Sequence, residues 1–404
     1  MERSELVELL TAEGLRLLDS LPPYPTKDEA VRLVGRLRKE GHSPELVAAV
    51  LTQSRLRQKA VGKFGPFAGR MLFTEAGLEQ ATRLPVAALH AGRFARAGLR
   101  QIADLGSGIG ADSMAMASLD LEVTAVDVDE VTAAIASYNL APFPTATVRN
   151  EAAEDISLDG FDAAWFDPAR RTVGHTDTSR LASASDYTPS LDLVFAAASR
   201  LPVGVKLGPG FDRSLIPQDA EAQWVSVDGQ LVEMTLWFGQ LARPGIRRSA
   251  LLVADGAHHE LHADEDADDA PVRELGEYVH EPDGSVIRAR LIGDLAVQLE
   301  AGMLGAGIAY LTSDSATSSP FATTFRVLER LPMDEKVLRR ALRERGIGIL
   351  EIKKRGVDVD PAAYRKRLSL RGERSGTIIL TRVAGKHAAL LIERVHPTDS
   401  AADD

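Results

Sequence analysis

A glycine-rich run at residues 102–112 constrains the fold of this chain more than any other feature. It reads Ile-Ala-Asp-Leu-Gly-Ser-Gly-Ile-Gly-Ala-Asp, a mainly apolar stretch followed by glycines at every second position. This order is typical of a buried strand that ends in a tight turn and leads into a helix. The run therefore predicts an α/β sheet with a ligand site at the carboxyl end of its first strand.

The spacing of the glycines, and the acid ahead of them, narrow the choice of ligand. A dinucleotide-binding turn reads G-x-G-x-x-G and places a helix N-terminus at a pyrophosphate. Here Gly106, Gly108 and Gly110 read G-x-G-x-G, and Asp104 precedes the first glycine by two residues. A carboxylate repels a pyrophosphate but attracts an ammonium. S-adenosylmethionine carries an ammonium, a sulfonium and no phosphate, so the turn suits that cofactor better than NAD.

Polar residues also follow the next strands of the expected sheet. Asp127 ends a strand expected over 122–127, where an acid accepts hydrogen bonds from ribose hydroxyls in adenosine-binding sheets. After the third strand we take Glu151 as the candidate partner of the adenine amine. The alternatives left open there are Asn150, Glu154 and Asp155.

The fourth strand ends in Asp-Pro-Ala-Arg-Arg at residues 167–171. Pro168 forces the residue before it into an extended conformation, which aims Asp167 into the crevice beyond the strand. A carboxylate or carbonyl there accepts a hydrogen bond from an amine that is being methylated, and Arg170 is a candidate to hold a phosphate or to stack on a base. These three residues are the predicted catalytic set. Lys206, after the fifth strand, is either a substrate contact or a structural lysine.

Composition limits the classes of function. The absence of cysteine excludes disulfides, thiolate metal sites and thiol catalysis. No apolar stretch approaches the length of a membrane span, and the N-terminal residues do not resemble a signal peptide, so we expect a cytoplasmic protein. No metal site is expected.

The net charge of −11 is unevenly distributed along the chain. Residues 32–70 contain nine basic and two acidic residues, and residues 336–394 contain sixteen basic ones. Between them, residues 255–283 contain eleven acids and one arginine. Because local charge matters more for recognition than the total, the basic segments keep a nucleic-acid partner possible.

Apolar periodicity divides the chain into parts. Helical spacing dominates the N-terminal residues, including a helix expected over 74–89. Short strands alternate with helices from about residue 99, which is typical of a parallel sheet, and a second α/β unit with a strand at 286–291 follows Pro271. The expected domains are a helical domain over 1–95, a catalytic domain over 96–255, an acidic linker over 256–273, an α/β domain over 274–396 and a flexible tail over 397–404.

Taken together, Asp104-Leu-Gly-Ser-Gly-Ile-Gly, Asp127 and Asp167-Pro-Ala-Arg resemble class I S-adenosylmethionine-dependent methyltransferases over about residues 99–240. The resemblance implies a Rossmann-like sheet that binds this cofactor. Members that methylate amines carry Asn/Asp-Pro-Pro-aromatic after the fourth strand, whereas here alanine and arginine replace the second proline and the aromatic residue. Members that methylate uracil C5 need a cysteine nucleophile, and the absence of cysteine excludes that route.

Two flanking segments extend the resemblance. Residues 71–74 are similar to the segment that precedes the core of RNA guanine methyltransferases such as trimethylguanosine synthase, which implies that Phe73 and Thr74 contact the cofactor. Residues 346–356 and the basic run to Arg374 resemble the THUMP-like domain attached to a group of bacterial methyltransferases. THUMP domains bind RNA, so this resemblance implies tRNA or rRNA as the partner.

The sequence leaves three functions to be tested. The first is a methyltransferase that acts on a base nitrogen in tRNA or rRNA, with the basic segments holding phosphates. The second is a methyltransferase with the same core that acts on a small molecule or a protein. The third is an RNA-binding protein in which the methyltransferase sheet is a relict.

Overall fold

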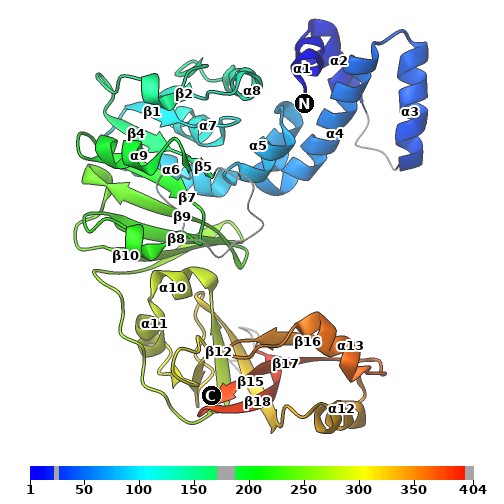
Figure 1. The fold of residues 1–404 in the computed structure, drawn as a ribbon, viewed down its shortest axis with the longest axis vertical. Helices are drawn as coiled ribbons and strands as arrows, with labels where there is room; N and C mark the ends of the chain where they lie inside the picture. Colours follow the sequence, from blue (N-terminus) through cyan, green and yellow to red (C-terminus); the bar gives the residue numbers. More distant parts are fainter. Residues whose placement is uncertain (22–26, 171–186, 396–404) are drawn as a thin grey trace. The chain divides into compact units, whose positions relative to one another are not determined.

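The computed structural model describes residues 1–21, 27–170 and 187–395, so the tail predicted over 397–404 lies outside the described residues. The chain forms two compact units, drawn in Figure 1. The first unit contains Met1–Ala220 and Thr235–Ala242, and the second contains Glu221–Met234 and Arg243–Asp404. No helix in the described ranges is long and apolar enough to cross a membrane.

Helices form the N-terminal part of the first unit, as the sequence predicts. Thr11, Ser43 and Thr74 begin three of them, because each side chain accepts a hydrogen bond from the backbone N–H three residues later. The helix expected over 74–89 is instead two helices, since Pro85 lacks the N–H that a continuous helix would require. The elements are α1 (Arg3–Leu9), α2 (Ala12–Ser20), α3 (Lys27–Lys39), α4 (Pro44–Phe64), η1 (Gly65–Arg70), α5 (Glu75–Gln80) and α6 (Leu84–Arg96).

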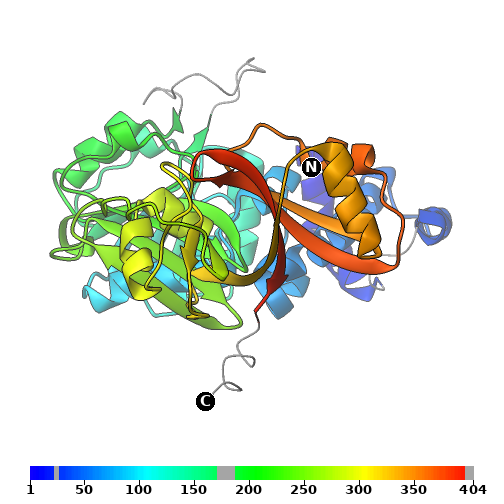
Figure 2. The ribbon, with the colours of Figure 1, turned by 90° about the horizontal axis from the view of Figure 1, so that it is seen from below.

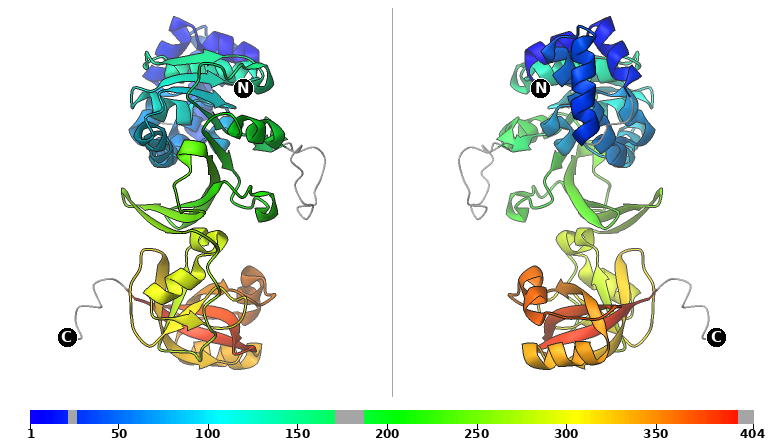
Figure 3. Two further views of the ribbon diagram at one scale, coloured as in Figure 1. Left: turned by 90° about the vertical axis from the view of Figure 1, so that its left-hand side faces the viewer. Right: turned by 90° about the vertical axis from the view of Figure 1, so that its right-hand side faces the viewer.

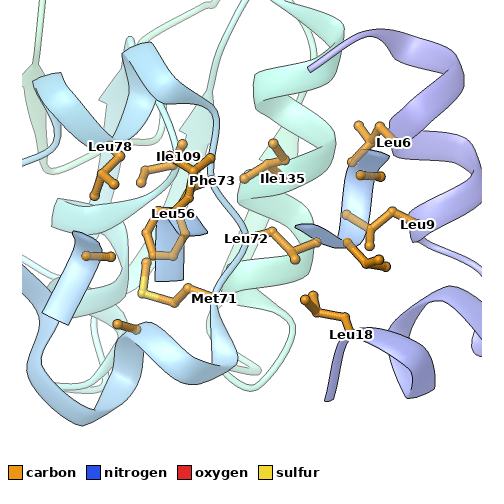
Figure 4. Packing of buried hydrophobic residues seen from close by; sticks show 14 of the residues in the cluster. Leu6, Leu9, Leu18, Leu56, Met71, Leu72, Phe73, Leu78, Ile109 and Ile135 are labelled. Atoms are coloured by element: carbon orange, nitrogen blue, oxygen red, sulfur yellow. The ribbon is translucent and has the colours of Figure 1, made fainter. Parts of the chain in front are cut away.

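These helices share a hydrophobic core with the α/β part of the same unit. Leu56, Leu72 and Phe73 belong to one buried cluster with Ile109 and Ile135 (Figure 4). The views in Figure 3 show the blue N-terminal helices packed beside the cyan α/β elements. The boundary that the sequence predicts at residue 95 therefore does not separate two packing units.

A parallel sheet with the order β7-β4-β1-β2-β3 forms the centre of the first unit. The strand expected over 122–127 is β2, which ends one residue earlier than predicted, and the strands alternate with helices as expected. The strand order reverses at β1, so the carboxyl ends of β1 and β4 lie at the switch point where such sheets bind ligands. The elements are β1 (Gln101–Leu105), α7 (Ala111–Ala117), β2 (Glu122–Val126), α8 (Glu130–Leu140), β3 (Ala146–Arg149), η2 (Ala153–Asp155), β4 (Ala163–Phe166), α9 (Leu191–Ala198) and β7 (Val203–Leu207).

The same sheet continues past β7 through β9, β8, β10 and β11, to nine strands. The last strand, β11 (Ala257–Ala263), corrects the prediction of a linker over 256–273. Asp255 and Gly256, with φ of 51° and 74°, form a tight turn that returns the chain antiparallel to β10. The buried Leu261 gives β11 an inward face in spite of its acidic surroundings. The other three strands are β8 (Glu221–Val227), β9 (Gln230–Phe238) and β10 (Arg248–Ala254).

The second unit contains a seven-stranded sheet with the order β13-β14-β12-β15-β18-β17-β16. Residues 286–291, predicted as a strand, instead fall largely in helix α10, because Asp283 accepts a hydrogen bond from the N–H of Ser285 and caps a helix there. Helices α12 and α13 cover one face of β16, β17 and β18 (Figure 2). The elements are β12 (Tyr278–Pro282), α10 (Gly284–Ala289), α11 (Ile292–Gln298), β13 (Gly302–Met303), β14 (Leu311–Ser313), β15 (Ala322–Leu331), α12 (Glu335–Glu344), β16 (Ile347–Lys354), α13 (Pro361–Leu368), β17 (Arg374–Val383) and β18 (Lys386–Arg394).

Candidate active site

The glycine turn has the backbone that its sequence predicts. Gly106, Gly108 and Gly110 all have positive φ, at 85°, 54° and 85°. A Cβ atom on Gly106 would lie 2.9 Å from the backbone oxygen of Asp167. Only glycine therefore permits the end of β4 to lie directly against the turn, and the structure brings the two predicted motifs together.

Asp104 lies buried beneath this turn. One carboxylate oxygen accepts a hydrogen bond from Ser113 Oγ at 2.5 Å, and the other, Oδ1, has no partner among the described residues. Burial, and then the nearby charge of Asp112, raise the pKa of Asp104 well above its usual value. The hydroxyl of Ser107, in the turn itself, is a second buried polar atom without a described partner. A buried acceptor and a buried hydroxyl at one turn fit the ammonium and carboxylate of an amino-acid group.

Asp127 joins the end of β2 to the glycine turn. Its Oδ2 accepts a hydrogen bond from the N–H of Gly108 at 3.0 Å, and its Oδ1 accepts one from the N–H of Asp129 at 2.9 Å. Burial raises the pKa of Asp127. Each oxygen retains a lone pair, so the carboxylate can accept further hydrogen bonds from ribose hydroxyls. Asp129 caps α8, because its carboxylate accepts a hydrogen bond from the N–H of Thr132.

The residues after β3 already have partners within the fold. Glu151 forms a bidentate ion pair with Arg149, with distances of 3.0 and 2.9 Å. The amide of Asn150 donates to the backbone oxygens of Asp127 and Val128. Glu151 therefore reaches an adenine amine only by sharing its carboxylate with Arg149.

Asp167 and Lys206 form an ion pair at the ends of β4 and β7. The side chain of Asp167 is 26% exposed and that of Lys206 is 10% exposed, so the ion pair is largely buried. Pro168 is buried, and Arg170 lies in the short strand β5 (Ala169–Arg170), which pairs with β6 (Tyr187–Thr188). For Arg170 the structure describes the backbone alone, and the neighbouring Arg171 lies outside the described residues.

Sequence reasoning missed a buried polar chain behind Lys206. Its ammonium donates to Thr82 Oγ1 at 3.1 Å, and Thr82 Oγ1 donates to Asp112 Oδ2 at 2.7 Å. The second oxygen of Asp112 lies 2.9 Å from His90 Nδ1. Burial opposes the charge of Asp112, but the hydrogen bond and charge of His90 outweigh it and lower the pKa of Asp112. The available signal in the sequence was Asp112, a lone aspartate in an apolar helix two residues after the last glycine of the turn.

The pre-core segment is fixed mainly by packing. Gln53 exchanges two hydrogen bonds with the backbone of Phe73, at 2.7 and 3.0 Å. The Phe73 ring is fully buried in the hydrophobic cluster (Figure 4). Its centroid lies 5.7 Å from that of Phe64. This placement corrects the expectation that Phe73 contacts the cofactor, since its ring belongs to the hydrophobic core. Thr74 caps α5 through its hydroxyl, which accepts from the N–H of Gly77.

Several side chains of the N-terminal basic segment are engaged within the fold. Arg55 forms a bidentate pair with Glu75 at 3.1 and 2.6 Å, and Lys63 donates to the backbone oxygens of Glu79 and Ala81. These contacts weaken the expectation that this segment holds phosphates. In the C-terminal basic segment, Arg365 and Lys366 are exposed on α13.

Comparisons with known proteins identify the family. Residues 322–394 match the THUMP domain-like family, and residues 2–60 match a family described as a domain of unknown function. An uncharacterised S-adenosylmethionine-dependent methyltransferase, found in two strains of Mycobacterium tuberculosis, is 34% identical over 358 residues, which is 86% of this chain and 95% of that protein. In the described parts of the chain, no group of three or more His, Asp or Glu residues is placed to hold a metal ion.

A solved structure supports the fold over nearly the whole chain. The crystal structure of a protein from Porphyromonas gingivalis W83, provisionally named a methyltransferase, has a TM-score of 0.70 and 19% identity. The match covers 92% of this chain and all of that one. With the identity and coverage of the mycobacterial relatives, the chain belongs to the S-adenosylmethionine-dependent methyltransferases, and it carries a C-terminal THUMP-like domain.

Proposed function

We propose that this enzyme methylates a base nitrogen in tRNA or rRNA. The observation that carries the proposal is the contact between the end of β4 and the glycine turn, where the backbone oxygen of Asp167 lies against Gly106. This contact would put hydrogen-bond acceptors for an amine beside the methyl donor. The THUMP-like domain supports RNA as the molecule that carries the amine.

The cofactor would be held by side chains and turn backbone from β1 and β2. The partnerless Oδ1 of Asp104 would accept from the ammonium, and Gly106, Gly108 and Gly110 would let the backbone approach the amino-acid group. Asp127 would accept from the ribose hydroxyls. Glu151 and Thr74 stay secondary candidates, because each already has a hydrogen-bond partner in the fold.

The bound cofactor supplies an electrophilic methyl group and a neutral thioether leaving group. Asp167 would accept a hydrogen bond from the target N–H, which orients the nitrogen lone pair and stabilises the positive charge that develops on the nitrogen. The same carboxylate would accept the proton that the nitrogen loses once the methyl group is bound. Pro168 fixes the backbone that carries this acceptor. Most of the rate enhancement then comes from holding two reactants in line.

The target nucleotide must leave the base stack, because the reactive nitrogen is otherwise paired or shielded. We therefore expect a single-stranded or flipped-out target. Exposed cations of the THUMP-like domain, such as Arg365 and Lys366, would hold the surrounding phosphates.

Nucleoside mass spectrometry tests the proposal directly. Total tRNA and rRNA from a strain that lacks the gene should lack one methylated nucleoside, and expression of the wild-type gene should restore it. An Asp167→Asn variant should fail to restore it. An unchanged nucleoside profile, with no binding of the purified protein to tRNA or rRNA at low salt, would favour a protein or small-molecule substrate instead.

A further inference from the structure

Residues of the N-terminal helical segment hold a lysine at the end of β7. Among the described residues, the Lys206 ammonium contacts the Asp167 carboxylate, the backbone oxygen of Gln80 at 3.1 Å and Thr82 Oγ1 at 3.1 Å. Gln80 is the last residue of α5, and Thr82 lies in the connection between α5 and α6. The lysine therefore joins the end of β4 to a segment that precedes the sheet in sequence.

The connection between α5 and α6 is itself firmly held. Thr82 donates to the buried Asp112, which His90 contacts on its other oxygen. Lys63 donates to the backbone oxygens of Glu79 and Ala81. A side chain attached to this connection consequently has little freedom to move.

The positive charge of Lys206 stabilises the group of carboxylates around it. Asp104, Asp112 and Asp167 lie close enough that their charges interact, and Lys206 is the cation whose charge acts on both Asp104 and Asp112. Without that cation, the repulsion between Asp104 and Asp167 would be less well offset, and the Asp167 carboxylate would turn toward solvent. The ion pair with Lys206 holds the carboxylate at the end of β4.

From this geometry we infer that Lys206 is a positioning residue for Asp167, and that the α5–α6 connection holds Lys206 in place. The inference rests on the proposed function, in which Asp167 accepts a hydrogen bond from the target amine. It gives the N-terminal helical segment a part in the active site, in addition to any contact it makes with RNA. The ammonium touches no reacting atom, and it acts on the methyl-transfer step through the Asp167 carboxylate that it orients.

Methyl transfer to RNA from a strain lacking the gene, with the full-length protein and radiolabelled S-adenosylmethionine, tests this inference. Lys206→Met should lower kcat about 100-fold, because a misplaced reactive group costs a factor of this order. Its affinity for S-adenosylhomocysteine, measured by calorimetry, should fall by a smaller factor than kcat, because Lys206 contacts Asp167 directly but acts on Asp104 only through its charge. Thr82→Val should lower kcat about tenfold, and Thr82→Ser should recover most of that loss because it keeps the hydroxyl.

A double-mutant cycle separates this inference from the proposed function. If Lys206 acts through Asp167, the Asp167→Asn/Lys206→Met enzyme should be no slower than Asp167→Asn alone. Losses that multiply would overturn the role of Lys206 and leave that of Asp167 intact. Full activity of Asp167→Asn would instead overturn the proposed function.

Crystal structures give a readout that does not depend on the substrate. In Lys206→Met the Asp167 carboxylate should leave its wild-type position beside the glycine turn. If the wild-type enzyme transfers no methyl group to RNA, the crystal structure of Lys206→Met tests the inference instead. An Asp167 carboxylate that has not moved would overturn the inference.

Discussion

At the scale of single residues, the site contains a carboxylate that its fold does not satisfy. Asp104 is buried, one of its oxygens lacks a partner among the described residues, and its pKa is raised by burial. Such a group costs stability unless a ligand supplies the missing donor. Binding sites commonly contain such groups, which lower the stability of the ligand-free protein but serve its function.

Replacing Asp104 should separate its effect on protein stability from its effect on cofactor binding. Asp104→Asn should raise the free energy of unfolding of the ligand-free protein by about 1 kcal/mol, because it removes a buried charge. The same change should weaken binding of S-adenosylmethionine by about tenfold or more, since the variant cannot form the charge-assisted hydrogen bond. Urea unfolding and calorimetry measure these quantities. A destabilised variant with unchanged cofactor affinity would contradict the assignment.

The raised pKa of Asp104 also predicts how binding depends on pH. The ionised carboxylate is the form that attracts an ammonium, so cofactor affinity should rise as the pH increases through the folded-state pKa of Asp104. Stability of the ligand-free protein should change in the opposite direction, because the charged form is the costly one. The groups that face the carboxylate are Ser113, Asp112, Asp167 and Lys206.

Calorimetric titrations at several pH values compare wild type with Asp104→Asn. The variant should lose the pH dependence that belongs to this group. A pH profile that is the same in both proteins would assign the titration to another residue.

At the scale of elements, the sequence predicts the parallel sheet and its ligand edge well, because period and turn residues are local signals. The glycine turn, Asp127 and Asp167 come together as expected, since strand ends in a parallel sheet share one edge. The buried polar chain through Thr82, Asp112 and His90 was not predictable in this way. Its members come from separate helices and connections, and nothing in their local sequence indicates that they meet.

The packing of Phe73 differs from the role in cofactor binding that the family resemblance implied. Phe73 lies in the hydrophobic core, so Phe73→Ala should lower the free energy of unfolding by about 3–5 kcal/mol. Phe73→Leu, which keeps most of the apolar volume, should cost less than about 1.5 kcal/mol. Urea denaturation measures both. Loss of cofactor affinity with unchanged stability in either variant would restore the cofactor role.

Strand β11, which lies where a linker was expected, predicts how the stability of the second unit changes at low pH. Glu260 on β11 pairs with Arg243 and accepts hydrogen bonds from Ser249 and Gln223, and despite its burial these contacts lower the pKa of Glu260 to about 2. Because the folded-state pKa is depressed, its stabilisation should be complete above the usual value of 4.5 and be lost as the pH falls toward about 2.

Acid titration of unfolding, followed by circular dichroism, compares wild type with Glu260→Gln. The variant should be less stable at neutral pH, and the difference between the two proteins should shrink as the pH falls. A difference that is constant with pH would show that the charge of Glu260 contributes nothing.

At the scale of the whole molecule, one chain combines a methyltransferase sheet with a THUMP-like domain. If the THUMP-like domain holds RNA, the double variant Arg365→Gln/Lys366→Gln should bind tRNA or rRNA more weakly. The dependence of affinity on salt should also flatten, by about one unit of slope for each phosphate that the variant no longer neutralises. Cofactor affinity should not change.

Arg55→Gln provides the comparison for this prediction, because the Arg55 guanidinium is already paired with Glu75. Filter binding at several salt concentrations should show a smaller change for it than for the α13 variant. An equal effect of both would return the N-terminal basic segment to the RNA-binding surface.

A crystal structure with S-adenosylhomocysteine tests the central claim most directly. It should show the ammonium of the ligand within hydrogen-bond distance of Asp104 Oδ1 and the ribose hydroxyls at Asp127. A ligand bound elsewhere, or one whose ammonium leaves Oδ1 without a donor, would contradict the account.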